Sequence, residues 1–597
     1  MIAGSSIGNK QMKSKRKNNS GSILMKSMVY VFAVIGFMCI LLMFLASKII
    51  FPNIDKSVTI GPNSTLVFDF NQSFPEIGKN DIISKFLGES SLSLYDLLSI
   101  MEAAQYDEKI SSVVALIDSS DLGSAQIDEV RNAVKKFRAS GKKAYVYSQG
   151  FGELGGGLSE YYLATAFDEI IMQPKSMLGI TGIGIEIPFF KNILKKIGIN
   201  PEFYARYEYK NAISSLIDEK MNKEYRKQLQ NVADSFGNYM IDNISKERKI
   251  QKQKMIEIVN SAPIFAEDAL EMGLIDGISY KTEFQSKLNS TNMVSAEDYL
   301  SGLYTRPSSN KIAIMFLEGV ILSGKSQAEK LNSEGVIGEA SVLEDIADIA
   351  KRDDIKAVVV RINSPGGSYS AASEIWYALN DLKEKKKIPL VVSQGDYAAS
   401  GGYFISLPAD YIYAEPMTLT GSIGVFGGKM VVSELMKKLQ INWDGVYFGN
   451  NADIDSYVNN FNAKEKEIFN KSLDVIYDDF TAKTAEARNI KPEEMDKLAR
   501  GRVWTGIQAV QNGLADKTGG VAEAIIKAAE LAELENYEPE MFPKQQSLED
   551  KISDFIAERT NISADRILSI IGIKKQDITI LKNIENNLVY SPIRIEM

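Results

Sequence analysis

Short apolar runs rich in β-branched residues recur along this chain, separated by segments with other spacings. The runs at 311–321, 356–362, 389–395 and 410–416 are mostly apolar, as expected for buried parallel strands. Between two of them, residues 372–387 place apolar side chains at helical spacing, which predicts an amphipathic helix. Alternation of strand and helix predicts an α/β fold with right-handed crossovers.

The same pattern occurs twice. Residues 161–200 align with 403–442 at a constant offset of 242. Identical residues, such as Tyr161 and Tyr403 or Gly179 and Gly421, recur along the two segments. Weaker matches continue upstream and downstream of this pair: 113–124 with 358–369, and 266–277 with 505–517. We therefore predict two copies of one α/β unit. The predicted bounds are 55–300 for the first copy, 301–540 for the second copy and 541–597 for a C-terminal extension.

A basic cluster at the start of the chain precedes an uncharged segment, 27–47, of 21 residues. A helix of that length spans a bilayer core of about 30 Å. The basic flank predicts that residues 1–26 stay in the cytoplasm and that the rest lies outside. A cleaved signal peptide is the alternative, but the apolar run is long for one and no small-residue cleavage site precedes the next segment. We expect a transmembrane anchor.

Composition excludes several chemistries. The 597 residues include no histidine, which rules out a Ser–His–Asp triad, a Cys–His dyad and a histidine-ligated zinc site. The single cysteine, Cys39, rules out an intrachain disulfide and a four-cysteine metal site. The net charge of −9 argues against nucleic acid as a partner. We expect no metal and no cofactor, and a hydrolase of this composition must move protons through Lys, Asp, Glu or Tyr.

Two glycine-containing turns in the second copy are candidates for catalysis. Asn363–Gly367 (NSPGG) directly follows a predicted strand, and its two glycines let backbone N–H groups approach a ligand, as an oxyanion hole requires. An ordinary Pro-Gly turn is the alternative. Ser400, within ASGGY, lies at a strand-to-helix turn that can present its hydroxyl beside the next N–H group. A serine that caps a helix is the alternative.

Two further segments complete the set of candidates. Thr420–Gly424 (TGSIG) contains Ser422 and could equally be a glycine-rich connection between strand and helix. Tyr207–Ala212 (YEYKNA), in the first copy, contains Lys210. Alone, this lysine would be read as a solvated surface residue.

The chain resembles the signal peptide peptidase A (protease IV) family in its long two-copy form. The motifs that carry this resemblance are NSPGG, ASGGY, LTGSIG and the segment around Lys210. The resemblance covers about 25–540. It implies tandem Clp-protease/crotonase-like domains and a membrane-anchored serine endopeptidase that uses a Ser/Lys dyad. The implied substrates are cleaved signal peptides and other apolar peptides. The implied setting is a homotetramer in the bacterial inner membrane, with the catalytic body on the periplasmic side.

The resemblance also implies roles for individual residues. Ser400 is the nucleophile, Lys210 is the general base, and the Ser422 hydroxyl orients the lysine. The N–H groups of an oxyanion hole come from Gly401 and from either Gly366 or Gly367. Asn211, after the lysine, departs from the serine of better-known members.

The repeat supports this assignment independently. The offset of 242 places Leu158 opposite Ser400, so the first copy has no nucleophile. Lys210 falls opposite Asn451 or Ala452, so the second copy has no lysine there. Each copy keeps one half of a dyad, as an enzyme with one composite site requires.

The lysine must be neutral to act as a base, and its ordinary pKa of about 10.4 leaves almost none neutral at pH 7. We therefore expect Lys210 to be buried, since burial lowers a lysine pKa by several units. Two other functions stay open from the residues alone. One is a crotonase-type enzyme acting on acyl thioesters, and the other is a non-enzymatic membrane scaffold.

Overall fold

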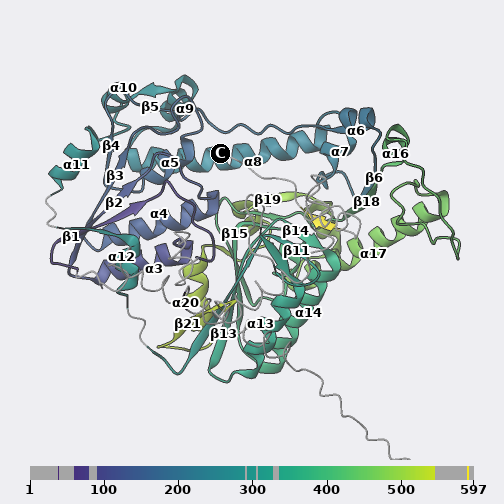
Figure 1. Ribbon diagram of the computed structural model, residues 1–597. Helices are drawn as coiled ribbons and strands as arrows, with labels where there is room; N and C mark the ends of the chain where they lie inside the picture. Colours follow the sequence, from purple (N-terminus) through teal and green to yellow (C-terminus); the bar gives the residue numbers. More distant parts are fainter. Residues whose placement is uncertain are drawn as a thin grey trace, which may run out of the picture. The chain divides into compact units, whose positions relative to one another are not determined.

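The computed structural model describes residues 38, 60–78, 91–288, 292–303, 307–326, 335–544 and 588–590 (Figure 1). The chain divides into two compact units, Met1–Thr59 and Ile60–Met597, and all that follows concerns the second unit. The predicted anchor, 27–47, lies outside the described residues apart from Met38. Within the described ranges, no helix combines the length and the apolar character needed to cross a bilayer.

The first copy is built on a parallel sheet whose strands follow the order β8-β4-β3-β2-β1-β9. A short antiparallel pair, β5 with β7, lies beside it, and β6 pairs outside the copy. The strands are β1 Ser64–Asp69, β2 Ile110–Leu116, β3 Lys143–Ser148, β4 Glu169–Met172, β5 Met177–Leu178, β6 Asn200–Ala205, β7 Ile264–Phe265, β8 Gly277–Ile278 and β9 Asn292–Ser295.

The second copy repeats this architecture. Its parallel path β20-β16-β15-β13-β10-β21 has the same strand order, and β17 with β19 forms the matching antiparallel pair. The strands of this path and of the antiparallel pair are β10 Lys311–Glu318, β13 Ile355–Ser364, β15 Leu390–Ala399, β16 Tyr411–Ala414, β17 Leu419–Gly421, β19 Val503–Thr505, β20 Lys517–Thr518 and β21 Glu538–Phe542. The α/β architecture with two related sheets agrees with the predicted repeat, while the bounds 55–300 and 301–540 stay predictions.

A small second sheet, in the order β12-β11-β14-β22, flanks the second copy. In it β14 pairs antiparallel with β22, a segment of the C-terminal extension. The strands are β11 Val320–Leu322, β12 Val336–Gly338, β14 Gly366–Ser368 and β22 Leu588–Tyr590, and β18, Phe426–Val431, lies apart and pairs with β6.

Helices cover the faces of both sheets (Figure 1). Those of the first copy are α3 Leu94–Tyr106, α4 Ser124–Ala139, α5 Leu158–Ala164, α6 Lys191–Ile197, α7 Ser214–Ile217, α8 Lys223–Arg248, α9 Lys252–Ser261, α10 Ala266–Glu271, α11 Lys281–Lys287 and α12 Ala296–Ser301. Those of the second copy are α13 Glu339–Lys351, α14 Tyr369–Lys386, α15 Gly401–Phe404, α16 Ser433–Lys438, α17 Ala463–Arg488, α18 Pro492–Leu498, α19 Gly506–Gln511 and α20 Val521–Leu531.

One predicted strand, 311–321, is two strands in the structure. The chain turns at Gly319, which has a φ of 108°, and β11 leaves the main sheet. A Cβ at Gly319 would lie 1.7 Å from the carbonyl oxygen of Gly335, so the turn requires glycine. The predicted helix at 372–387 corresponds to α14.

The two copies share buried surface. The apolar core of the first copy includes Met417, Leu419 and Val503 from the second. Helix α8 of the first copy also contacts β19 of the second, and in Figure 1 it extends from beside α7 past β19 to α5. The antiparallel pair of β6 with β18 joins the copies a second time, far from α5.

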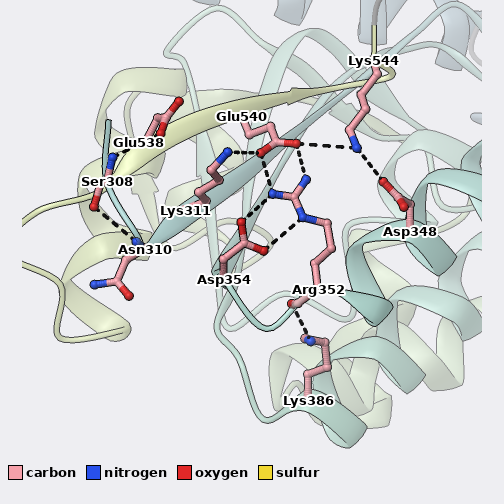
Figure 2. Close-up of polar contacts among 10 residues, drawn as sticks. All are labelled: Ser308, Asn310, Lys311, Asp348, Arg352, Asp354, Lys386, Glu538, Glu540 and Lys544. Atoms are coloured by element: carbon pink, nitrogen blue, oxygen red, sulfur yellow. Dashed lines mark hydrogen bonds and ion pairs between the residues drawn. The ribbon is translucent and has the colours of Figure 1, made fainter. Parts of the chain in front are cut away.

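An ion-pair cluster holds the edge strand β21 to the second sheet (Figure 2). Glu540 of β21 accepts hydrogen bonds from Arg352 and from Lys311, the latter at 2.9 Å. Arg352 also binds Asp354 at 2.7 Å, and Lys544 binds Asp348 at 2.8 Å. These contacts fix the last described strand before the C-terminal extension.

Candidate active site

Lys210 lies on a first-copy loop that follows β6 and packs against the second copy. Strand β6 pairs antiparallel with β18, from Asn200 opposite Val431 to Ala205 opposite Phe426. The Arg206 N–H continues the ladder by donating to the carbonyl of Val425 at 2.8 Å. The ladder therefore crosses the boundary between the copies and ends four residues before the lysine.

Two glycines of the second copy make room for this lysine. A Cβ at Gly424 would lie 3.3 Å from Lys210 Cδ. A Cβ at Gly501, which has a φ of 81°, would lie 2.5 Å from the Lys210 backbone nitrogen. The Tyr209 N–H donates to the carbonyl of Arg500 at 3.2 Å and holds the loop against this turn. The close approach of two backbones thus positions the lysine.

Ser400 lies at the turn between β15 and α15 in a strained conformation, with φ 58° and ψ −117°. Positive φ is uncommon for a residue with a side chain, and such strain occurs often at catalytic sites. The Ser400 N–H donates to the carbonyl of Gly421 at 2.8 Å, and its hydroxyl makes no capping bond to α15. The residue is fully buried rather than open to solvent. The helix-cap interpretation of Ser400 is therefore wrong.

Three polar atoms surround the amine of Lys210. Its Nζ lies 2.6 Å from Ser400 Oγ, 3.0 Å from Ser422 Oγ and 2.9 Å from the Ser422 carbonyl oxygen. Ser422, like Ser400, has a positive φ, of 50°, and its N–H donates to the carbonyl of Arg502 at 2.8 Å. The structure thus brings together all three predicted side chains, although they come from loops 190 and 212 residues away from the lysine.

The electrostatic setting of Lys210 is unusual for a lysine. The side chain is 3% exposed, and burial lowers its pKa well below the ordinary lysine value. No carboxylate contributes to this shift, since burial is the whole cause. An apolar setting without an anion favours the neutral amine.

The predicted oxyanion glycines border the serine. Gly366 has a φ of 111°, and its N–H donates to Ser364 Oγ at 3.2 Å. A Cβ at Gly401 would lie 3.2 Å from the nitrogen of Gly367, so these two backbones are adjacent. A Cβ at Gly367 would lie 2.0 Å from the carbonyl oxygen of Ile321, which explains the glycine there.

Comparison with known proteins decides the family. The model of "Peptidase family S49" matches residues 136–295 and 382–535, which lie in the two copies. The chain belongs to peptidase family S49. It is therefore a serine peptidase.

Several curated relatives resemble this S49 chain. "Protease 4" of Haemophilus influenzae is 30% identical over 483 residues, covering 76% of this chain and 75% of the relative. "Serine protease SPPA, chloroplastic" of Arabidopsis thaliana is 30% identical over 457 residues, covering 74% and 66%. "Putative signal peptide peptidase SppA" of Enterococcus faecium is 33% identical over 220 residues, covering 36% and 62%.

The rest of the S49 site shows what the sequence alone did not reveal. Leu158, opposite Ser400 in the repeat, is buried at the start of α5, and Asn451 is exposed. Asn211 is buried beside the dyad, with its amide nitrogen unpartnered. The space-making role of Gly501 has no sequence signal, because that residue lies in none of the recognised motifs. Within the described ranges, no group of three or more His, Cys, Asp or Glu side chains could hold a metal ion.

Proposed function

We propose that this S49 peptidase degrades cleaved signal peptides and other apolar peptides, with Ser400 as the nucleophile and Lys210 as the general base. The observation that carries the proposal is the 2.6 Å separation of Lys210 Nζ and Ser400 Oγ, both buried. A relative is named a signal peptide peptidase, which supports the substrate class. Membership in a peptidase family favours neither the acyl-thioester enzyme nor the scaffold.

The three contacts of Lys210 match the valences of a neutral amine. Such an amine has two N–H donors and one lone pair. Ser422 offers two acceptors, its carbonyl oxygen and its hydroxyl oxygen, at 2.9 and 3.0 Å. The lone pair is then left for the hydroxyl hydrogen of Ser400. Ser422 therefore orients the amine so that it accepts the proton as Ser400 attacks the scissile carbonyl.

Proton transfer then continues through the same lysine. Once protonated, Lys210 donates to the leaving amine, and the acyl group stays on Ser400. A water molecule that gives its proton to neutral Lys210 hydrolyses the acyl-enzyme. For the developing oxyanion we propose the N–H groups of Gly401 and Gly367, because the Gly366 N–H already donates to Ser364.

The edge of β14 offers a binding mode for an extended peptide. In the structure β22 pairs antiparallel with this edge, with Val589 opposite Gly367. Addition of a strand to an exposed edge binds a peptide through its backbone and leaves alternate side chains for pockets. We propose that a substrate displaces β22 from this edge and pairs with β14 in its place, beside the oxyanion glycines.

Hydrolysis of a synthetic signal peptide by the purified protein tests the proposal. Wild type is expected to cleave it, and Ser400→Ala is expected to lose all measurable cleavage while keeping the wild-type melting temperature. Ser245→Ala, which changes a buried serine of α8 whose hydroxyl has no hydrogen-bond partner among the described residues, is the matched control and should keep most activity. Cleavage by Ser400→Ala at the wild-type rate would remove Ser400 from the mechanism.

We also propose the location and assembly that the resemblance implies. Segment 27–47 anchors the chain in the bacterial inner membrane, and the catalytic body lies on the periplasmic side. Four chains associate as a ring. The internal repeat supplies an independent argument for this association.

The ladder between β6 and β18 has a counterpart in the repeat. At the offset of 242, the segment equivalent to β6 in the second copy is 442–447, and the segment equivalent to β18 in the first copy is 184–189. Neither segment forms a strand. Residues 441–450 are exposed throughout, with Trp443 at 64% and Phe448 at 102%. If 442–447 of one chain pair with 184–189 of the next, the internal ladder is reproduced between chains. Such head-to-tail contacts form a ring where the rotation from one chain to the next closes, which is the arrangement proposed for four chains.

Sedimentation of the detergent-solubilised protein tests this association. We expect the wild-type protein to have the mass of four chains. The double variant Trp443→Glu/Phe448→Glu is expected to have the mass of one chain. Tyr377→Glu, which changes an exposed aromatic residue of α14, should leave the wild-type mass unchanged. A wild-type protein of one chain would contradict the proposed ring.

A further inference from the structure

The strand that carries the nucleophile is bent just before Ser400. Along β13, Ile362 and Ser364 are two positions apart, but their partners on β15, Gln394 and Ala398, are four apart. Strand β15 therefore contains a bulge of two extra residues. Such bulges bend a strand and redirect the side chains that follow.

This bulge changes the neighbour of β15. Before it, residues 391–394 pair with β16. After it, Tyr397, Ala398 and Ala399 pair with Leu419, Thr420 and Gly421 of β17. Because β17 leads directly into Ser422, the bulge is what brings Ser400 beside the serine that orients the lysine.

Asp396, in the bulge, binds the first copy. Its carboxylate accepts a hydrogen bond from the Ala125 N–H at 2.8 Å, in the first turn of α4. The N-cap residue of α4 is Gly123, which has no side chain to cap the helix. A Cβ there would lie 2.1 Å from the Asp396 carboxylate. The second copy thus supplies the N-terminal cap of a first-copy helix.

Helix α4 in turn caps a helix of the second copy. Glu129 of α4 accepts a hydrogen bond from the Val521 N–H at 2.7 Å, at the start of α20. Between the two caps lies Arg361, fully buried, which binds Glu76 and Glu129 of the first copy at 2.9 and 2.6 Å. Arg361 also donates to Ser393 of β15 at 2.9 Å. The capping is reciprocal, but only the Asp396 cap lies in the bulge.

We propose that Asp396 is a positioning residue for Ser400: by capping α4 it fixes the bulge of β15 and hence the place of the nucleophile. The inference rests on the proposed role of Ser400. It implies that the first copy positions the site from two directions, with Lys210 on one side and the α4 N-terminus on the other. Inside the bulge, the Tyr397 N–H donates to Asn363 Oδ1 at 3.1 Å and gives local support.

Steady-state kinetics of Asp396→Ala on a synthetic signal peptide tests the inference. We expect kcat to fall roughly tenfold to hundredfold with KM nearly unchanged, because a misplacement of about 1 Å has effects of that size. Acylation of Ser400 by a small fluorophosphonate should slow by the same factor. Asp396→Asn keeps an acceptor for the Ala125 N–H and should restore most of kcat.

Two further variants separate positioning from general stability. Glu129→Gln weakens the reciprocal cap of α20 and should lower the melting temperature while leaving kcat within about twofold of wild type. In Gly123→Ala, the added Cβ displaces the Asp396 carboxylate from the N-terminus of α4, so this variant should show the same loss of kcat. It tests the positioning role of Asp396 if Asp396→Ala does not fold.

Three results would overturn the inference: a folded Asp396→Ala with wild-type kcat, a folded Gly123→Ala with wild-type kcat, or equal losses of kcat in Asp396→Ala and Glu129→Gln. Failure of the proposed function has a different signature, since it appears as cleavage by Ser400→Ala.

Discussion

For Lys210, the proposed general base, burial lowers the pKa toward the range that a catalytic histidine has intrinsically. A chain of 597 residues without histidine needs another base near neutral pH. The amine is enclosed by backbone and by two serines, with no carboxylate to favour its charged form. Any change that admits water or an anion there will restore the ordinary pKa and remove the base.

The tight contact with Gly501 makes the position of this lysine testable. In Gly501→Ala, the new Cβ meets the Lys210 backbone at about 2.5 Å, so the lysine loop must move. We expect kcat to fall about a hundredfold. Gly513→Ala is the matched control: φ is similar, 77° against 81°, but nothing lies within 4 Å of the added Cβ. It should lower stability and leave kcat intact, and equal kcat values for the two variants would refute the steric argument.

Among single residues, sequence motifs point to the groups proposed to carry the chemistry but not to the residues that position them. Ser400, Ser422 and Lys210 were predicted from short motifs and a resemblance, and the structure brings their side chains together. Gly501 and Asp396 were missed, because each acts through a contact with a residue more than 250 positions away. No local pattern records such a contact.

Among the elements, β15 is the strand whose end the hydrophobic pattern does not predict. The apolar run 389–395 predicts a strand, but β15 continues to Ala399 through the bulge. Asp396 and Tyr397, which follow the run, look like the start of a loop when only apolar character is considered. Their partners lie on other elements, so the extension could not be predicted from the run itself.

Strand β21 offers a prediction at this scale, through Glu540. The hydrogen bond from Arg352 is the main reason that the pKa of Glu540 is lowered, to about 2 (Figure 2). A lowered folded-state pKa stabilises the fold above the unfolded value of about 4.3, and this contribution is lost as pH falls toward 2. Glu540→Gln should therefore lower the melting temperature by about 2–4 °C at pH 7 and by about half as much near pH 3.

Thermal unfolding of Glu540→Gln at both pH values, beside the exposed Glu535→Gln, checks this prediction. The Glu535 variant should match wild type at each pH. A Glu540→Gln deficit of equal size at pH 3 and pH 7 would show that the ion-pair cluster does not stabilise β21 through charge.

For the whole molecule, the repeat predicted more than any single motif did. Two sheets of identical strand order follow from two similar stretches of sequence, and the loss of Ser from one copy and Lys from the other predicts one composite site. What the repeat could not show is the manner in which the copies join. The β6–β18 ladder and the exchanged helix caps depend on surfaces that differ between the copies.

In the proposed mechanism, a lysine of the first copy activates a serine of the second. The rate at which a fluorophosphonate acylates Ser400 at pH 7 tests it most directly, because the probe needs activation of the serine but not the peptide-binding edge of β14. We predict that Lys210→Ala lowers this rate by about 10²–10⁴-fold. Lys142→Ala, which removes a half-buried lysine of the first copy outside the β6–β18 ladder, should leave the rate near wild type. Acylation of Ser400 at the wild-type rate in Lys210→Ala would contradict the account.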